Sequence, residues 1–395
     1  MRTVDSPVFD ADNHYYEALD AFTRHLDPAL GPRVIEWVEI NGRRYHSLGG
    51  RVSRAVTNPT FDPIAPAGAL ADYFRGNPDG APMHALMGSP EPIRAEYRDR
   101  VARLAVMDAQ GLDQVWLFPT LGMLYEEALK DDPEAVVLLF RAFNRWLAED
   151  WGMAHADRIF AAPYITLANV GEAVRELEWA LDQDARTVVL RAAAPTTALG
   201  PLSPAADTFD PFWARVNEAG ITVIVHAGDS GYTSQGYAKD GFGASFDPAG
   251  AAKPSVRMFA IERAAYDFLI QLMFDDVYTR FPNVRVASVE NGSEFLPDLF
   301  KKLASTKRKM PRYWKDDPAD IFREHVWINP FWEDDPYLVT ELMGADRVIF
   351  GSDWPHIEGM PKPLDYVTEI KELDDASQRL ILRENALALN VRRPV

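Results

Sequence analysis

Residues 210–226 read DPFWARVNEAGITVIVH and contain one complete unit of a helix followed by a strand. Apolar residues recur at helical spacing over Asp210–Ala219, and Gly220 stands where a left-handed residue commonly ends a helix. Thr222–His226 is a short, β-branched, apolar run. Short buried strands that alternate with amphipathic helices are typical of a parallel sheet. This stretch therefore predicts an α/β fold.

The same alternation extends over the whole chain. Helical spacing recurs at Ile93–Gln110, Pro133–Met153, Val170–Leu181, Pro336–Leu342 and Leu380–Leu389, and Gly111 stands before a strand as Gly220 does. The expected strands are Val8–His14, Gln114–Pro119, Ile159–Ile165, Thr187–Arg191, Thr222–His226, Arg285–Glu290, Val326–Asn329 and Arg347–Asp353. Eight such units predict a (β/α)8 TIM-like barrel, which reaches 395 residues as a single domain, 1–395, when it carries insertions.

Two stretches interrupt this alternation. Arg33–Val52 is predicted to form a β-hairpin, because Asn41-Gly42 is a strong two-residue turn signal. Thr57–Pro92 is rich in Pro, Gly and Ala, and we expect a long loop that covers the barrel mouth. Hairpin and loop together form an insertion over residues 33–92, after the first strand. Gly228–Ser255 is predicted to be a second long loop, after the fifth strand.

The composition excludes several classes of protein. The net charge of −18 would repel a phosphate backbone, so no nucleic-acid partner is expected. The chain has no cysteine, which excludes disulfides and thiolate metal sites, so any metal must be held by His, Asp and Glu. We find neither a signal peptide nor the roughly 20 consecutive apolar residues that cross a bilayer. We therefore expect a cytoplasmic protein with no membrane partner.

Several potential metal ligands fall at the carboxyl ends of the expected strands. Three of the eight histidines lie there, namely His14, His226 and His356. On a parallel barrel these strand ends meet at the catalytic rim, and a charge on a buried strand is costly unless it is paired or metal-bound. Asp12 and His14 share one face of their strand because they are two residues apart. The expected metal ligands are Asp12, His14, His226, Glu290 and Asp353.

Two alternatives to this set of metal ligands remain. In one, Asp10 and Asp12 only cap a loop. In the other, Glu17, close to His14 in the chain, adds a further ligand.

Longer motifs resemble a known family. They are DADNHYYE at residues 10–17, VIVHAGD at 223–229, GSDWPH at 351–356 and RENALALN at 383–390. By these motifs the chain is similar, over essentially its whole length, to the amidohydrolase-related family. The branch that it resembles includes aminocarboxymuconate-semialdehyde decarboxylase and the resorcylate-type decarboxylases. The resemblance implies a metal-dependent barrel enzyme in which Asp353 binds metal and takes part in catalysis. It also implies a homo-oligomer, with a hetero-oligomer as the alternative.

Two positions depart from the family's pattern. Many members have His-x-His on the first strand, where this chain has Asp12-x-His14. Many also have a histidine followed by glycine after the sixth strand, where this chain has Glu290-Asn291-Gly292. The extra carboxylate makes the ligand set harder, which suits Mn²⁺, Fe²⁺ or a carboxylate-bridged pair better than Zn²⁺. The expected cofactor is a divalent metal (Mn, Fe or Zn), as one ion or two.

The leading functional hypothesis is non-oxidative decarboxylation or hydrolysis of a small carboxylate-bearing or aromatic substrate. A dinuclear iron or iron–manganese oxygenase on the same fold is the alternative, and an accessory metal-binding subunit is the second alternative. Asp353 is the expected proton shuttle, with Glu290 or His356 as the second acid–base group. These three residues are the expected catalytic groups.

Three further residues are expected to bind the substrate. Arg191, at the end of the fourth strand, is the candidate partner for a substrate carboxylate. An ion pair with a nearby acidic residue is the alternative role for Arg191. Tyr15 and Trp354 are expected to form an apolar wall at the barrel mouth, with ordinary packing as the alternative.

Overall fold

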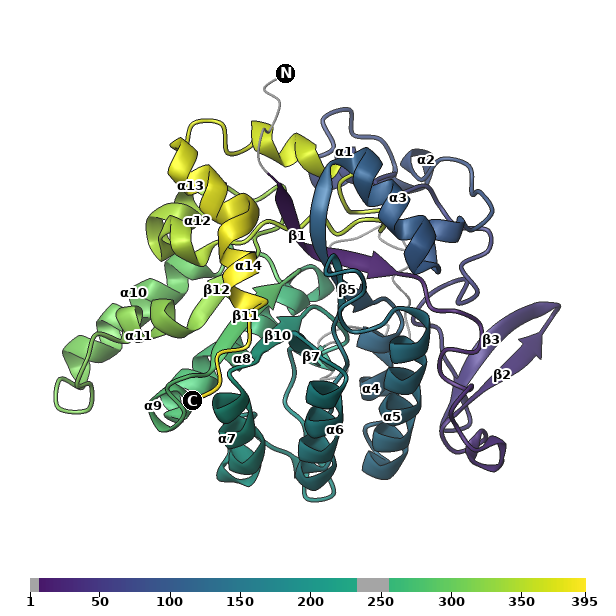
Figure 1. The fold of residues 1–395 in the computed structure, drawn as a ribbon, viewed down its shortest axis with the longest axis horizontal. Coiled ribbons are helices and arrows are strands. Elements are labelled where there is room, and N and C mark those ends of the chain that lie inside the picture. Colours follow the sequence, from purple (N-terminus) through teal and green to yellow (C-terminus); the bar gives the residue numbers. More distant parts are fainter. Residues whose placement is uncertain (1–6, 233–255) are drawn as a thin grey trace.

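Two parallel sheets form the centre of the computed structural model, which describes residues 7–232 and 256–395 (Figure 1). The first has the order β1-β5-β6, with β1 at Val8–Tyr15, β5 at Leu112–Pro119 and β6 at Ile159–Ala161. The second has the order β12-β11-β10-β7, with β7 at Thr187–Arg191, β10 at Thr222–His226, β11 at Arg285–Val289 and β12 at Val326–Ile328. Every strand pair within these sheets is parallel. The predicted α/β class with a parallel sheet is therefore confirmed.

Backbone bridges join the two sheets on both sides. The segment after β6 reaches β7, where Tyr164 and Val189 form a parallel bridge. Between β12 and β1, Val348 bridges Ile328 and Trp354 bridges Asn13, again in parallel. These contacts connect eight parallel segments into a ring, as in a (β/α)8 barrel.

Helices surround this ring (Figure 1). The longer ones are α3 at Arg100–Gln110, α4 at Gly122–Leu129, α5 at Pro133–Asp150, α6 at Val170–Asp182, α7 at Asp210–Ala219, α8 at Ala260–Phe274, α10 at Leu296–Lys309, α11 at Pro318–His325 and α12 at Pro336–Met343. The shorter ones are α1 at Ala71–Phe74, α2 at Met83–Leu86, α9 at Val277–Arg280, α13 at Asp375–Arg379 and α14 at Asn385–Leu389. Gly111 and Gly220 end α3 and α7 with φ of 75° and 57°, which confirms both predicted left-handed caps.

The eighth predicted strand, Arg347–Asp353, forms single bridges rather than a continuous ladder. Gly351 lies so close to β1 that a Cβ there would overlap Asp12. The backbone N–H of Ser352 donates to the side-chain Oδ1 of Asp10 at 2.9 Å instead of to a backbone carbonyl of β1. Asp353 then adopts a left-handed conformation with φ of 56°. The predicted location was right, but the last residues leave strand geometry to place the Asp353 side chain.

Other predicted bounds were wrong by a few residues, each for a local reason. The strand Ile159–Ile165 ends at Ala161, because Pro163 has no N–H to donate. The helix Ile93–Gln110 begins only at Arg100, where Asp99 caps it by accepting from the Ala102 N–H. The helix Leu380–Leu389 contains a π-helical turn at Leu380–Glu384 before α14 begins.

The predicted hairpin is confirmed. It consists of β2 at Ile35–Ile40 and β3 at Arg43–Leu48, with β4 at Arg51–Val52 as a third strand. Asn41 and Gly42 both have positive φ, 53° and 75°, as a tight hairpin turn requires. In Figure 1 the hairpin projects from the molecule beyond α5. A fourth, two-stranded sheet pairs β8 at Thr196–Thr197 with β9 at Gly200–Pro201.

The loop predicted at Thr57–Pro92 packs on the segment that follows Asp353. The N–H of Gly68 donates to His356 O at 2.9 Å, and the N–H of Leu70 donates to Ile357 O at 2.7 Å. Most of the second predicted loop, Gly228–Ser255, lies outside the described residues. Among the described residues, every helix is too short or too polar to span a bilayer.

Candidate metal centre

Strand β1 supplies two side chains to one face of the ring. Because alternate residues of a strand point to the same side, Asp12 and His14 both point inward, and both are buried. The distance from His14 Nε2 to Asp12 Oδ1 is 3.2 Å. One short segment thus provides a carboxylate and an imidazole to the same point.

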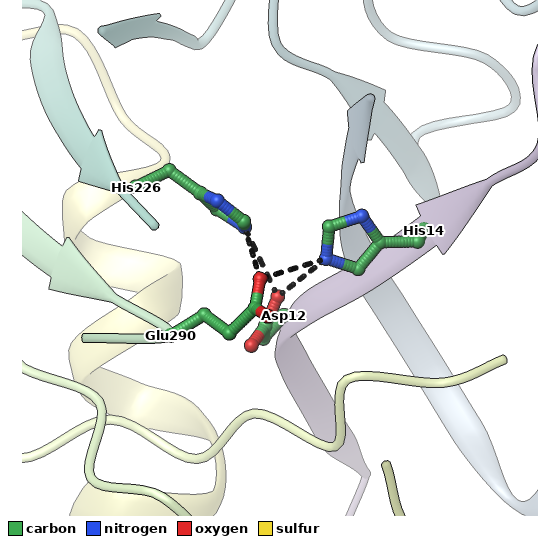
Figure 2. A group of neighbouring side chains, drawn as sticks. All are labelled: Asp12, His14, His226 and Glu290. Carbon is green, nitrogen blue, oxygen red and sulfur yellow. Dashed lines mark ion pairs between the residues drawn. The ribbon is translucent and has the colours of Figure 1, made fainter. Parts of the chain in front are cut away.

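The third side chain comes from the end of β10. His226 Nδ1 lies 2.9 Å from Ala227 O, which only accepts hydrogen bonds, so Nδ1 carries the proton and the Nε2 lone pair is free. His226 Nε2 lies 3.5 Å from Asp12 Oδ1 and 3.4 Å from Glu290 Oε2. Figure 2 shows the side chains of Asp12, His14, His226 and Glu290 pointing toward one another from three strands.

Two carboxylates reach this point through left-handed backbone. Glu290 follows β11 with φ of 55°, and Asp353 follows the eighth segment with φ of 56°. Such a conformation costs a non-glycine residue about 1–3 kcal/mol and is commonly found at functional sites. Glu290 Oε2 and Asp353 Oδ1 lie 3.5 Å and 3.4 Å from His14 Nε2. The left-handed backbone at Glu290 and Asp353 therefore places both carboxylates against the imidazole of His14.

Six side chains form two overlapping groups with metal-ligand spacing. The first contains Asp12, His14, His226 and Glu290, and the second contains His14, Glu290, Asp353 and His356. Within each group the ligand atoms all lie within 4.8 Å of one another. In the second group, His356 Nδ1 lies 2.6 Å from Asp353 Oδ1. The five expected ligands thus gather at the rim, and the expected catalytic His356 joins them.

Burial and mutual charge shift the pKa values of these groups. Burial alone would raise the pKa of Asp12, but contacts with His14 and His226 hold it below its ordinary value. Burial would lower the pKa of His14, yet Asp12 and Glu290 raise it to about 10. Burial raises the pKa of Asp353 well above its ordinary value, and the charge of the neighbouring Glu290 adds to this increase. The rim is therefore short of positive charge.

The donor set fits a divalent cation. Five buried ligand atoms have no hydrogen-bond partner among the described residues, namely Asp12 Oδ1, His14 Nε2, His226 Nε2, Asp353 Oδ1 and His356 Nδ1. Leaving buried polar atoms without partners is costly, and one bound ion would satisfy several of them at once. Carboxylate and imidazole ligands suit Mn²⁺, Fe²⁺ and Zn²⁺. Asp12, His14, His226 and Glu290 are the residues that would hold the ion.

A comparison with known families decides the affiliation. A family model described as amidohydrolase matches residues 82–389, which is more than half of the chain. The chain belongs to the amidohydrolase family. This makes it an enzyme, and the match confirms the resemblance to the amidohydrolase family seen in the sequence.

Solved structures agree with this affiliation. An amidohydrolase from Mycobacterium avium subsp. paratuberculosis is 39% identical, with 98% of this chain and 100% of that one covered and a TM-score of 0.91. A dihydroxybenzoic acid decarboxylase from Polaromonas, with bound manganese and the inhibitor 2-nitroresorcinol, is 17% identical, with coverages of 82% and 93% and a TM-score of 0.58. A 5-carboxyvanillate decarboxylase from Sphingomonas paucimobilis is 15% identical, with coverages of 97% and 98% and a TM-score of 0.60. At these lower identities, the two decarboxylases show a shared fold.

Arg191 of this amidohydrolase lies beside the metal centre but is already paired. It stands opposite His226 in the register of β7 and β10. Its Nη1 donates to Glu127 Oε2 at 2.9 Å and to Asp229 O at 2.6 Å. Its Nη2 is buried without a hydrogen-bond partner in the described part of the chain. The ion pair that we kept as an alternative is thus present, and one donor of the guanidinium is left over.

Tyr15 and Trp354 do not line the barrel mouth, which corrects the expectation for both. Tyr15 points to the other side of β1 from His14, and its ring packs 5.5 Å from that of Trp151. The guanidinium carbon of Arg103 lies over the ring of Trp354, 4.6 Å from the centre of that ring. Both aromatic side chains are buried behind the metal centre, between the ring and the helices.

Other residues around the metal centre were missed. Phe118 of β5 faces inward, with its ring 4.7 Å from that of His226, and strand periodicity would have placed it beside His14. Arg103 of α3 donates to His14 O at 2.7 Å, a contact with no sequence signal because 89 residues separate the pair.

Glu17, the candidate for a further ligand, has a different role. Its Oε1 accepts from the N–H groups of Thr120 and Gly122, so Glu17 holds a backbone turn instead.

Asp10 also has a structural role that the sequence did not predict. We expected at most a loop cap, but Asp10 is buried and joins β1 to the eighth segment. Its carboxylate accepts from the Asp12 N–H, Asn13 Nδ2, the Ser352 N–H and Ser352 Oγ. Asp10 therefore fixes the segments that carry Asp12 and Asp353.

Proposed function

We propose that this amidohydrolase decarboxylates or hydrolyses a small carboxylate-bearing or aromatic substrate with the help of a divalent cation. The convergence of unpartnered ligand atoms from Asp12, His14, His226 and Asp353 is the observation that carries the proposal. Such atoms at the carboxyl ends of parallel strands lie where barrel enzymes bind their substrates. The manganese in the Polaromonas decarboxylase supports Mn²⁺ as a suitable ion.

A bound cation would act as a Lewis acid toward a substrate oxygen or a water molecule. The protein's own groups would then move protons. Asp353 suits this role because burial and the neighbouring Glu290 raise its pKa, so that it holds a proton more readily than an ordinary carboxyl. His356 Nδ1, 2.6 Å from Asp353 Oδ1, is placed to receive that proton. Burial and the neighbouring His14 and His226 hold the pKa of His356 well below its ordinary value, so that it would return the proton readily.

Substrate binding would use one charged and one apolar contact. The unpartnered Nη2 of Arg191 supports a contact with a substrate carboxylate, although Glu127 already balances much of the guanidinium charge. Phe118, which packs against His226, supports an apolar wall in place of Tyr15 and Trp354. Together these contacts favour a flat, anionic substrate. The two aromatic-acid decarboxylases that share the fold act on substrates of this kind, as their names state.

The test is a substrate screen on the full chain loaded in turn with Mn²⁺, Fe²⁺ and Zn²⁺. Hydroxylated aromatic acids are assayed for carbon dioxide release, and amides and esters of similar size for hydrolysis. We expect one of the two activities, lost in Asp353→Asn. Stoichiometric consumption of dioxygen with two redox-active ions per chain would overturn the proposal in favour of the dinuclear oxygenase. If Asp353→Asn keeps full activity within a native complex, the accessory-subunit alternative gains support.

A further inference from the structure

The β2–β4 sheet is attached to the rest of the protein by one of its faces. Trp37 Nε1 donates to Leu19 O at 2.7 Å, and His46 Nδ1 lies 2.8 Å from the hydroxyl of Tyr125. Trp37 and His46 are directly paired between β2 and β3, so they share this inward face. Alternation along each strand then sends the intervening residues outward.

Near the turn, the outward face combines apolar and basic side chains. Ile40, Arg43, Tyr45, Val52 and Arg54 line one hollow there, and we call these residues the hairpin face. Ile40 is 40% exposed and Val52 is 38% exposed, which is high for such side chains. In Figure 1, β2 and β3 stand clear of the helices, so the face is open to a large partner.

The charge of the hairpin face is opposite to that of the chain as a whole. Within the described residues, neither Arg43 nor Arg54 forms an ion pair. Elsewhere, Arg24 and Arg33 each contact two acidic residues or more. The chain carries 59 acidic against 41 basic residues, for a net charge of −18. Two unpaired arginines around an apolar centre are therefore complementary to the acidic surface that this chain itself presents.

We propose that the hairpin face docks on an acidic surface of a second copy of this chain. Direct stacking of two hairpin faces would bring the same arginines together, and their repulsion disfavours it. In a two-fold dimer, each hairpin instead lies on the body of the partner, so the contact occurs twice. This inference concerns assembly and does not depend on the proposed function.

The size of the face predicts how strong this dimer is. A strand of six residues is about 20 Å long and three strands are about 10 Å wide, so one hairpin face covers about 200 Å². Two reciprocal contacts bury about 800 Å² on both partners together, less than the roughly 1,200 Å² at which stable interfaces begin. The dimer is therefore concentration-dependent and, because its pairs are charged and exposed, sensitive to salt.

Sedimentation velocity of the full chain over about 1–100 μM, at about 0.05 M and 1 M NaCl, tests the proposal. We expect dimer at the low salt and monomer at the high salt. Arg43→Glu and, separately, Arg54→Glu should each weaken dimerisation at least about tenfold, because a like charge then faces the acidic partner. Arg312→Glu is the matched control, since Arg312 is also exposed and lies beyond α10, away from the hairpin.

Four outcomes overturn the proposal. The first is a wild-type chain that stays monomeric at every concentration and salt. The second is a dimer that Arg43→Glu and Arg54→Glu leave intact while circular dichroism shows both variants folded. The third is an equal weakening by Arg312→Glu, which would mean that net charge and not the hairpin face controls association. A monomer that binds another acidic protein through this face also contradicts docking on a second copy.

Discussion

His356 Nε2 lies 2.9 Å from the hydroxyl of Thr120. That hydroxyl donates its hydrogen to Tyr15 O at 2.8 Å, so it can only accept from His356. His356 therefore carries a proton on Nε2, and its Nδ1 lone pair faces Asp353. A ring nitrogen that donates to a fixed oxygen sets both the tautomer and the orientation of the other nitrogen.

Thr120→Val should consequently lower kcat by about 10- to 100-fold, because the ring of His356 loses its orientation. Thr120→Ser keeps the hydroxyl and should restore most of the rate. The measurements are steady-state kinetics on the substrate found in the screen and the ¹⁵N chemical shifts of His356. A Val variant as active as the Ser variant would show that the contact does not matter for catalysis.

His226→Ala should lower the affinity for Mn²⁺ by at least about 100-fold, since it removes a ligand whose lone pair is already aimed. His84→Ala, at an exposed histidine of α2, should bind the metal like the wild type. Equilibrium dialysis with elemental analysis gives both affinities. Equal metal content in the two variants would rule out His226 as a ligand.

Metal binding should depend on pH. Burial opposes protonation of His14, but Asp12 and Glu290 raise its pKa to about 10 in the metal-free chain. Below that pH the cation must displace a proton, so its affinity should rise about tenfold per pH unit from about pH 6 to 9. Competition with a chelator of known pH dependence measures this slope. In Asp12→Asn the rise should level off at a lower pH, because one of the groups that raise the pKa of His14 is gone, and a flat wild-type profile would contradict this prediction.

Asp10→Ala should lower the free energy of unfolding by about 3 kcal/mol, because four buried donors around Asp10 lose their acceptor. Asp10→Asn retains one acceptor oxygen and should cost about half as much. Urea denaturation followed by circular dichroism gives both values. A loss below about 1 kcal/mol in Asp10→Ala would mean that the link between β1 and the eighth segment contributes little.

Arg191→Lys separates the two roles of this residue. Lysine keeps a positive charge for Glu127 but cannot supply the second, Nη2 donor. If Arg191 contacts a substrate carboxylate, KM should rise about tenfold or more while the melting temperature changes little. A large drop in melting temperature with unchanged KM would leave only the structural ion pair.

Most residues of the metal centre could be predicted from the sequence, and fewer of the residues around it. Asp12, His14, His226, Glu290 and Asp353 could be predicted because each stands at the end of an apolar run, where strand periodicity and barrel topology define its position. These sequence signals are local, and the structure gathers all five residues at one rim.

One error went against the local pattern, and the others arose where tertiary contacts override it. Strand alternation should have excluded Tyr15, which follows the inward-facing His14, but its position at the barrel rim suggested substrate contact. Trp354 was misplaced because the left-handed backbone of Asp353 changes the direction of the chain just before it. The contacts of Arg103 and Asp10 link positions 89 and 342 residues apart, and no pattern within a single segment predicts them.

The central claim is that strands distant in the sequence hold one divalent cation between Asp12, His14, His226 and Glu290. Anomalous diffraction from a crystal of the Mn²⁺-loaded protein, collected at the manganese edge, tests it most directly. We predict a peak about 2.0–2.3 Å from His14 Nε2, His226 Nε2 and the two carboxylates. A peak elsewhere, or none at this point with the protein saturated, would contradict the account.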